Sequence, residues 1–147
     1  MNRISIKHID ISSWTLVICL ALVAYSNFNF SLWEKDDKVI VSDVVAYYAY
    51  LPAAFIYDDL SLEFINNGKD LLGKNFWGKK NPNGNLVFTA SCGMSMLYFP
   101  FFITAHKASQ LMGYPAKGYS SFYRIALIIS SFFYLSLGSI FLRKFLN

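Results

Sequence analysis

Acidic side chains are the residues of this sequence best suited to chemistry, and they are concentrated in one segment. Eight of the nine acidic residues lie between Glu34 and Asp70, and none follows Asp70. Most of them are mixed with lysines, as in a solvated loop. Asp43 differs because apolar residues 39–41 and 44–45 flank it. A carboxylate in this setting can accept a proton from a hydroxyl group as a general base, or it can stabilise the start of a helix.

The other reactive side chains exclude several kinds of site. Cys19 and Cys92 have no metal-ligand spacing and no histidine near them, so we expect neither a zinc site nor a disulfide framework. The sequence shows no Ser-His-Asp set, glycine-rich phosphate loop or cluster of metal-binding histidines. We therefore expect no metal and no cofactor.

The composition is that of a membrane protein. Hydrophobic residues make up 55% of the chain and charged residues only 15%. Uncharged runs cover residues 11–30, 86–105 and 125–142. Each is close to the roughly 20 residues that a helix needs to cross the hydrocarbon of a bilayer. The sequence predicts an all-α integral membrane protein with about three transmembrane helices, over residues 11–30, 86–112 and 122–142.

Basic residues give this prediction an orientation. Arg3 and Lys7 hold the N-terminus in the cytoplasm, so residues 31–85 form an extracytoplasmic loop. The connection after the second span carries Lys107, Lys117 and Arg124 without an acidic residue, as expected of a cytoplasmic turn. Arg143 and Lys144 disagree with three crossings, and the run from Leu86, interrupted by Gly93 and Pro100, fits a partly re-entrant segment as an alternative. The scattered basic residues form no stripe for nucleic acid, although the net charge is +4.

The first run also has features of a signal peptide. Two basic residues precede its apolar core, and Ala24-Tyr25-Ser26 is similar to a cleavage site. Its apolar character continues through Phe28, Phe30 and Trp33, which favours an uncleaved anchor with an interfacial aromatic belt. Membrane lipid is therefore an expected partner, together with a second helix within the membrane.

The loop is expected to carry short interfacial helices. Ser42 can cap a helix that begins at Asp43, and Pro52 should kink or split that helix. A second short helix is predicted over residues 61–67. Residues 81–84, Asn-Pro-Asn-Gly, predict a type I turn that reverses the chain.

Three segments resemble the N-terminal portion of polytopic GT-C-type glycosyltransferases, particularly bacterial ones: Ser42–Leu60 after the first span, Pro100–His106 and Gly113–Ser120. In that family an Asp soon after the first span, followed by paired aromatic residues, is the catalytic base or positions the acceptor. Asp43 is the matching residue. Val44 stands where the family often has a second acidic residue.

The resemblance implies transfer of a sugar from a polyprenyl-phosphate-linked donor, at the bacterial inner membrane, in cell-envelope glycan assembly. Asp43 would be the catalytic residue and Tyr47 and Tyr48 would stack on a sugar. Cations at the membrane surface would stabilise the departing lipid phosphate. The residues expected to bind substrate are thus Tyr47, Tyr48, Lys74, Lys79 and Lys80.

A non-enzymatic function remains as the alternative. The enzymes of this family have many more spans than this chain, which resembles only their N-terminal portion. A small membrane protein that binds lipid-linked intermediates, or a larger transferase, would fit the same composition. Interfacial tyrosines and lysines that only anchor the chain, and an Asp43 that only stabilises a helix start, would agree with that alternative.

Overall fold

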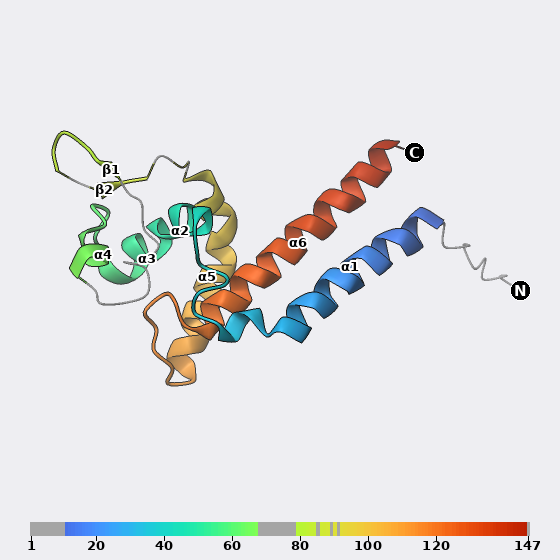
Figure 1. Ribbon diagram of the computed structural model, residues 1–147, viewed down its shortest axis with the longest axis horizontal. Helices are drawn as coiled ribbons and strands as arrows, with labels where there is room; N and C mark the ends of the chain where they lie inside the picture. The colour runs from blue at the N-terminus through green and yellow to red at the C-terminus, as the bar shows by residue number, and fades with distance from the viewer. Residues whose placement is uncertain (1–10, 68–78, 85, 89, 91, 147) are drawn as a thin grey trace, which may run out of the picture. The chain divides into compact units, whose positions relative to one another are not determined.

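The computed structural model describes residues 11–67, 79–84, 86–88, 90 and 92–146. These residues are mostly helical, with one two-stranded hairpin (Figure 1). The expected helical class is therefore confirmed. The chain forms two compact units, one of Met1–Ser31 with Phe132–Asn147 and one of Leu32–Ser131.

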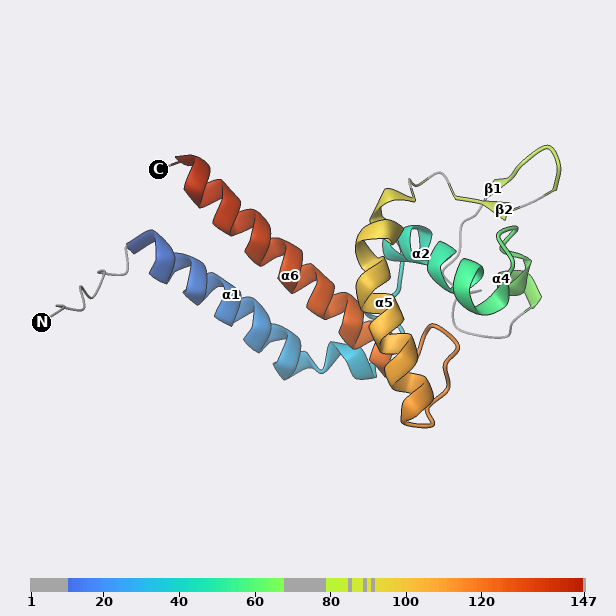
Figure 2. The same ribbon diagram turned by 180° about the vertical axis from the view of Figure 1, so that it is seen from behind.

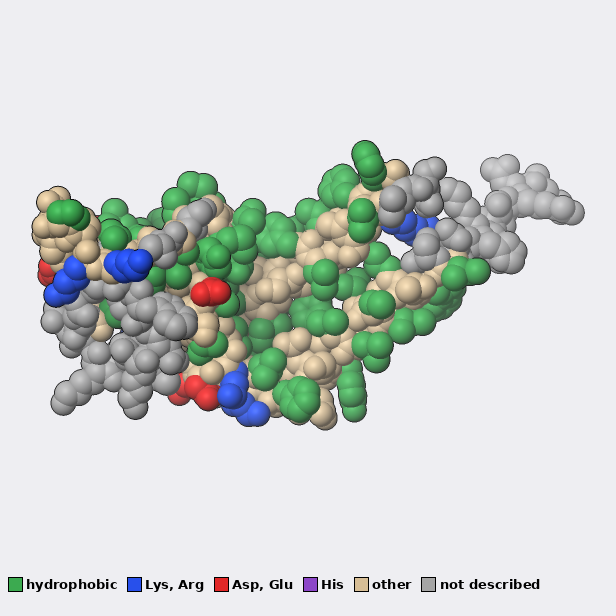
Figure 3. Space-filling model, turned by 45° about the horizontal axis from the view of Figure 1, so that its top comes forward, with side chains coloured by type: hydrophobic (Ala, Val, Ile, Leu, Met, Phe, Trp, Pro, Cys, Tyr) green, Lys and Arg blue, Asp and Glu red, His purple; other side chains and the backbone are tan. Residues whose placement is uncertain are grey.

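The first unit consists of α1 (Ile11–Phe30) and the C-terminal part of α6 (Ser121–Leu146). The two helices run in opposite directions (Figure 2). Figure 3 shows hydrophobic side chains along both of them. The large apolar side chains of α1, such as Trp14 and Leu22, are exposed in the folded chain, so this helix has the surface of one that contacts lipid.

Two helices among the described residues are long and apolar enough to cross a membrane, Ser13–Phe30 and Ser121–Phe145. The first lies near the N-terminus, and signal sequences can have the same length and apolar composition. Its helix has the bounds predicted for the first span. The last helix continues beyond the predicted end at residue 142, through Arg143 and Lys144, because basic side chains in the last turn stabilise the negative end of a helix.

The run that begins at Leu86 does not form one continuous helix. Leu86–Val87 is strand β2, which pairs antiparallel with β1 (Lys79–Lys80), and helix α5 (Gly93–Leu111) starts later. The predicted turn over residues 81–84 joins the two strands, where the Gly84 amide donates to the carbonyl of Asn81 at 2.9 Å. The strand pairing occupies the residues that were expected to begin the second span.

The second unit contains the helices of the predicted loop. A 3-10 turn, η1 (Leu32–Glu34), is followed by α2 (Asp43–Tyr48), α3 (Tyr50–Pro52), the π-helical turn η2 (Ala53–Tyr57) and α4 (Glu63–Asn67). The helix begins at Asp43, as predicted, and its regular α-helical geometry ends at Pro52. Proline has no backbone N–H to continue the helical ladder, so a change of geometry after it is expected. The second short helix lies within the predicted residues 61–67.

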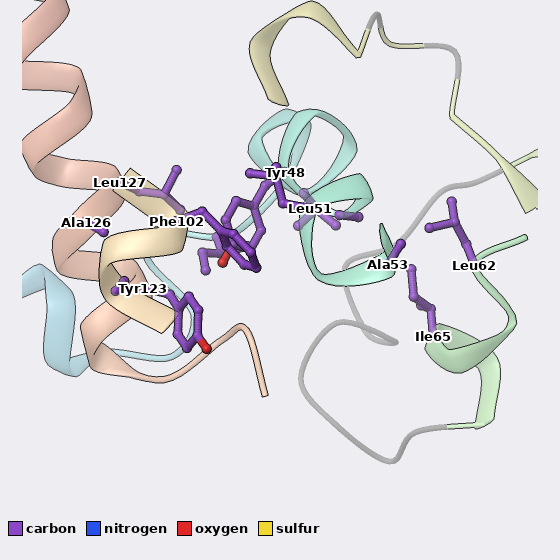
Figure 4. Close-up of a cluster of buried hydrophobic side chains, with 13 residues drawn as sticks. Tyr48, Leu51, Ala53, Leu62, Ile65, Phe102, Tyr123, Ala126 and Leu127 are labelled. Atoms are coloured by element: carbon purple, nitrogen blue, oxygen red, sulfur yellow. The ribbon is translucent and has the colours of Figure 1, made fainter. Parts of the chain in front are cut away.

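The core of the second unit is rich in aromatic side chains. Tyr48 of α2, Phe102 of α5 and Tyr123 of α6 are almost fully buried and lie next to one another (Figure 4). The Tyr48 hydroxyl donates to the carbonyl of Gly118 at 2.6 Å. Burial raises the pKa of Tyr48 well above its usual value, so this hydroxyl remains a neutral donor. The apolar face of α2 is thus covered by protein. Its apolar residues, which were expected to contact the bilayer surface, contribute to the core of the second unit.

Gly118, in the connection between α5 and α6, lies against this core. Its φ is +91°, and a Cβ atom there would lie 2.8 Å from Cβ of Pro52. Gly118→Ala combines a left-handed backbone cost of about 1–2 kcal/mol with steric overlap, so it should lower the free energy of unfolding clearly. Chemical unfolding of the purified protein in detergent micelles measures the loss.

Gly113→Ala is the matched control. Gly113 also has a positive φ, +70°, but an added Cβ would meet no atom within 4 Å. It should therefore show only the backbone cost. Equal losses for the two variants would contradict the close approach of Gly118 to Pro52.

Candidate functional site

Asp43 occupies the first turn of α2 and its side chain is exposed. Ser42 precedes it with a φ of +50° and makes no side-chain capping bond, so the capping role predicted for Ser42 is wrong. The carboxylate forms no ion pair with Lys79 or Lys80 of β1, both of which are exposed. Lys74 lies outside the described residues. Asp43 is thus open to an acceptor hydroxyl, and the structure does not join it to Lys79 or Lys80.

The two tyrosines that were expected to stack on a sugar differ in their surroundings. Tyr48 is only 1% exposed, packed against Phe102 and Tyr119 at ring-centroid distances of 5.9 and 6.0 Å. Its ring is closed to a ligand, so Tyr48 belongs to the core. Tyr47 is partly exposed, and its carbonyl accepts a hydrogen bond from Ser95 of α5. Only Tyr47 keeps a surface that a sugar ring can reach.

An open apolar groove lies in the same unit as Asp43. Its volume is about 690 Å³, within the range of small-molecule pockets, and its lining is almost entirely apolar. A groove of this kind suits a hydrocarbon chain better than a sugar, because nearly all of its surface lacks hydrogen-bonding groups. Its walls come from α3 and η2 on one side and from α5 on the other, and include Tyr50, Ala54, Phe55, Ser95, Met96 and Phe99.

Arg124 is a residue whose role the sequence did not reveal. It was interpreted as a marker of the cytoplasmic side, but its side chain is only 7% exposed. One terminal guanidinium nitrogen lies 2.5 Å from Asp36 Oδ1 and 2.9 Å from the carbonyl of Tyr119. The Nε atom donates to the carbonyl of Trp33 at 2.5 Å. The only signal in the sequence was an isolated arginine next to a long apolar run, which alone does not specify its partners.

A second polar contact joins α5 to α6. His106 Nδ1 lies 2.7 Å from the Tyr123 hydroxyl, and His106 Nε2 lies 3.0 Å from Nε2 of Gln110. The imidazole ring also stacks parallel to Phe102. His106 of α5 thus packs against α6 within the second unit.

Comparison of the chain with protein-family models, with curated proteins and with solved structures finds no match. The resemblance to GT-C-type glycosyltransferases therefore remains a prediction from the segments that contain Asp43, His106 and Gly118. Within the described residues, no group of three or more His, Cys, Asp or Glu side chains is placed to hold a metal ion.

Asp59 is a structural carboxylate whose hydrogen bonds make the stability of the fold depend on pH. Its Oδ1 accepts hydrogen bonds from the hydroxyl of Ser61 at 2.5 Å and from the Ser61 amide at 3.0 Å, and its Oδ2 accepts from the Phe64 amide at 2.9 Å. The bond from the Ser61 hydroxyl, with the backbone amides, lowers the pKa of Asp59, although burial opposes this. The charged form is therefore favoured by folding. Its stabilising contribution is complete above the ordinary Asp pKa and disappears as the pH falls through the lower folded-state pKa.

Nuclear magnetic resonance of the protein in micelles can follow this titration at the Phe64 amide proton. We expect a midpoint below about 3.9, the usual value for aspartate. Asp59→Asn should abolish the transition and so assigns it. A midpoint at or above the usual value would show that the turn does not favour the ionised carboxylate.

Proposed function

We propose that the protein is a GT-C-like membrane glycosyltransferase, or the N-terminal part of one. It would transfer a sugar from a lipid-phosphate-linked donor during cell-envelope glycan assembly. Its place would be the bacterial inner membrane, with the N-terminus in the cytoplasm. The observation that carries the proposal is an exposed carboxylate, Asp43, in the same compact unit as an apolar groove of about 690 Å³.

The proposed step needs a base and no further reactant. Asp43 accepts the proton of an acceptor hydroxyl, whose oxygen attacks the anomeric carbon of the donor sugar. The bond between that carbon and the phosphate oxygen breaks, and the lipid phosphate leaves with the electron pair. The groove binds part of the lipid chain, and Tyr47 is the aromatic side chain available to the sugar. The exposed Lys79 and Lys80 are candidates to stabilise the leaving phosphate.

The alternative is a non-enzymatic protein that binds lipid-linked intermediates. It is favoured by the absence of any ion pair between Asp43 and the described lysines of β1. In this case the groove would bind the lipid, and Asp43 would serve only the start of α2. Binding of a polyprenyl-phosphate sugar without transfer to an acceptor would support this function.

Asp43→Asn separates the two functions. It removes the negative charge and most of the basicity while preserving size, so transfer should fall by roughly a hundredfold to ten-thousandfold if Asp43 is the base. A helix-start charge alone contributes about 0.3–1 kcal/mol, too little to remove the protein from the membrane. The measurement is transfer of radiolabelled hexose from polyprenyl-phosphate hexose to endogenous glycan in membranes that contain the full-length protein encoded by the gene.

Asp37→Asn is the matched control. Asp37 is exposed and, among the described residues, pairs with the exposed Lys38 at 3.2 Å, a kind of contact that contributes little to stability. Asp36 would be unsuitable because it pairs with the buried Arg124. Equal transfer by the Asp43 and Asp37 variants, at equal protein abundance, would rule out the catalytic assignment.

A further inference from the structure

The contacts of Arg124 join the segment that follows α1 to the first turn of α6. Trp33 follows the end of α1 at Phe30 by three residues, and Arg124 follows the start of α6 at Ser121 by three residues. The Nε of Arg124 lies 2.5 Å from the Trp33 carbonyl, and its Nη1 lies 2.5 Å from Oδ1 of Asp36. The residues that follow α1 and the first turn of α6 thus share one cluster of polar contacts.

Two further hydrogen bonds join the predicted loop to the connection between α5 and α6. The Tyr48 hydroxyl donates to the Gly118 carbonyl at 2.6 Å, and the Tyr57 hydroxyl donates to the Lys117 carbonyl at 3.0 Å. If α5 crossed the bilayer, these partners would be separated by about 30 Å of hydrocarbon. Hydrogen-bonded groups cannot lie on opposite faces of a membrane.

The surroundings of α5 agree with a position outside the bilayer. Its Ser95 donates to the carbonyl of Tyr47 in α2, and its Phe102 packs against Tyr48. The first turn and the middle of α5 are therefore packed against α2 of the same compact unit. It also carries Pro100, His106 and Lys107, and it is not among the helices long and apolar enough to cross a membrane.

We propose that the chain crosses the membrane twice, through α1 and α6, and that the described residues between Leu32 and Ser120, α5 included, lie together on one face. This arrangement replaces the three-span prediction. Arg3, Lys7, Arg143 and Lys144 then all lie on the opposite face, which the bias of basic residues identifies as the cytoplasm. The disagreement that Arg143 and Lys144 caused with three crossings disappears.

The remaining basic residues do not oppose this topology. Arg124 forms an ion pair with Asp36 inside the folded unit, so its charge is locally compensated. Lys107 and Lys117 belong to a segment longer than about 60 residues, and segments of that length translocate largely regardless of charge. The orientation is therefore set by the basic residues that precede α1 and by those in the last turn of α6.

Single cysteines at exposed positions test the proposal in the intact chain. In a background with Cys19→Ser and Cys92→Ser, the variants are Lys80→Cys in the hairpin, Lys117→Cys in the α5–α6 connection and Lys144→Cys at the end of α6. An impermeant maleimide is added to spheroplasts before or after lysis. Lys80→Cys and Lys117→Cys should both react before lysis, and Lys144→Cys only afterwards.

Reaction of Lys80→Cys before lysis and of Lys117→Cys only afterwards would overturn the proposal and restore a crossing through α5. Reaction of both only after lysis would overturn the assigned orientation. The assay needs no enzymatic activity, so its outcome is separate from the test of Asp43. A cysteine that fails to react is checked by denaturing the protein and labelling it a second time. Labelling after denaturation shows that the protein is abundant and that its cysteine is present and reduced.

Discussion

The buried guanidinium of Arg124 is the constraint on which the arrangement of the second unit depends. An arginine side chain that is 7% exposed must replace its water with protein partners, since a buried unpaired charge is very unfavourable. Asp36 and the carbonyls of Trp33 and Tyr119 supply those partners. They come from the segment after α1 and from the residues before α6, so satisfying one charge brings two distant parts of the chain together. Because the carboxylate of Asp36 is itself about half exposed, solvent screens part of the attraction.

The aromatic core explains why Asp43 is left at the surface. Tyr48 turns inward from α2 toward Phe102 and Tyr123, which leaves the opposite face of this short helix to carry its polar residue. The same packing of α3 and η2 against α5 leaves an apolar groove open. The structure thus separates residues that support the fold, such as Tyr48, Asp59 and Arg124, from an exposed carboxylate that supports no contact of its own in the described chain. Substitution of Asp43 should therefore change the free energy of unfolding only a little.

Local structure was predicted well from the sequence, whereas contacts between residues far apart in the chain were not. The bounds of α1, the start of α2 at Asp43, the change at Pro52 and the turn at Asn81–Gly84 follow from apolar run length and from the backbone preferences of proline and glycine. The partners of Arg124 and Tyr48 lie up to 91 and 70 residues away, and no periodicity encodes such pairs. Tyr48 was therefore predicted to stack on a sugar and Arg124 to lie in a cytoplasmic turn. The apolar run from Leu86 was predicted to be a span, although its first residues pair in a hairpin.

A double-mutant cycle on Asp36 and Arg124 tests the central claim most directly. Asp36→Asn, Arg124→Met and the double variant are unfolded in detergent micelles, and the coupling free energy is taken from the four stabilities. Residues in direct contact within a polar network couple by about 0.5–3 kcal/mol, and we expect a favourable coupling within that range. The exposed pair Asp37 and Lys38, treated in the same way, should give a smaller value. A coupling near zero between Asp36 and Arg124 would show that this ion pair does not hold the segment after α1 to the start of α6.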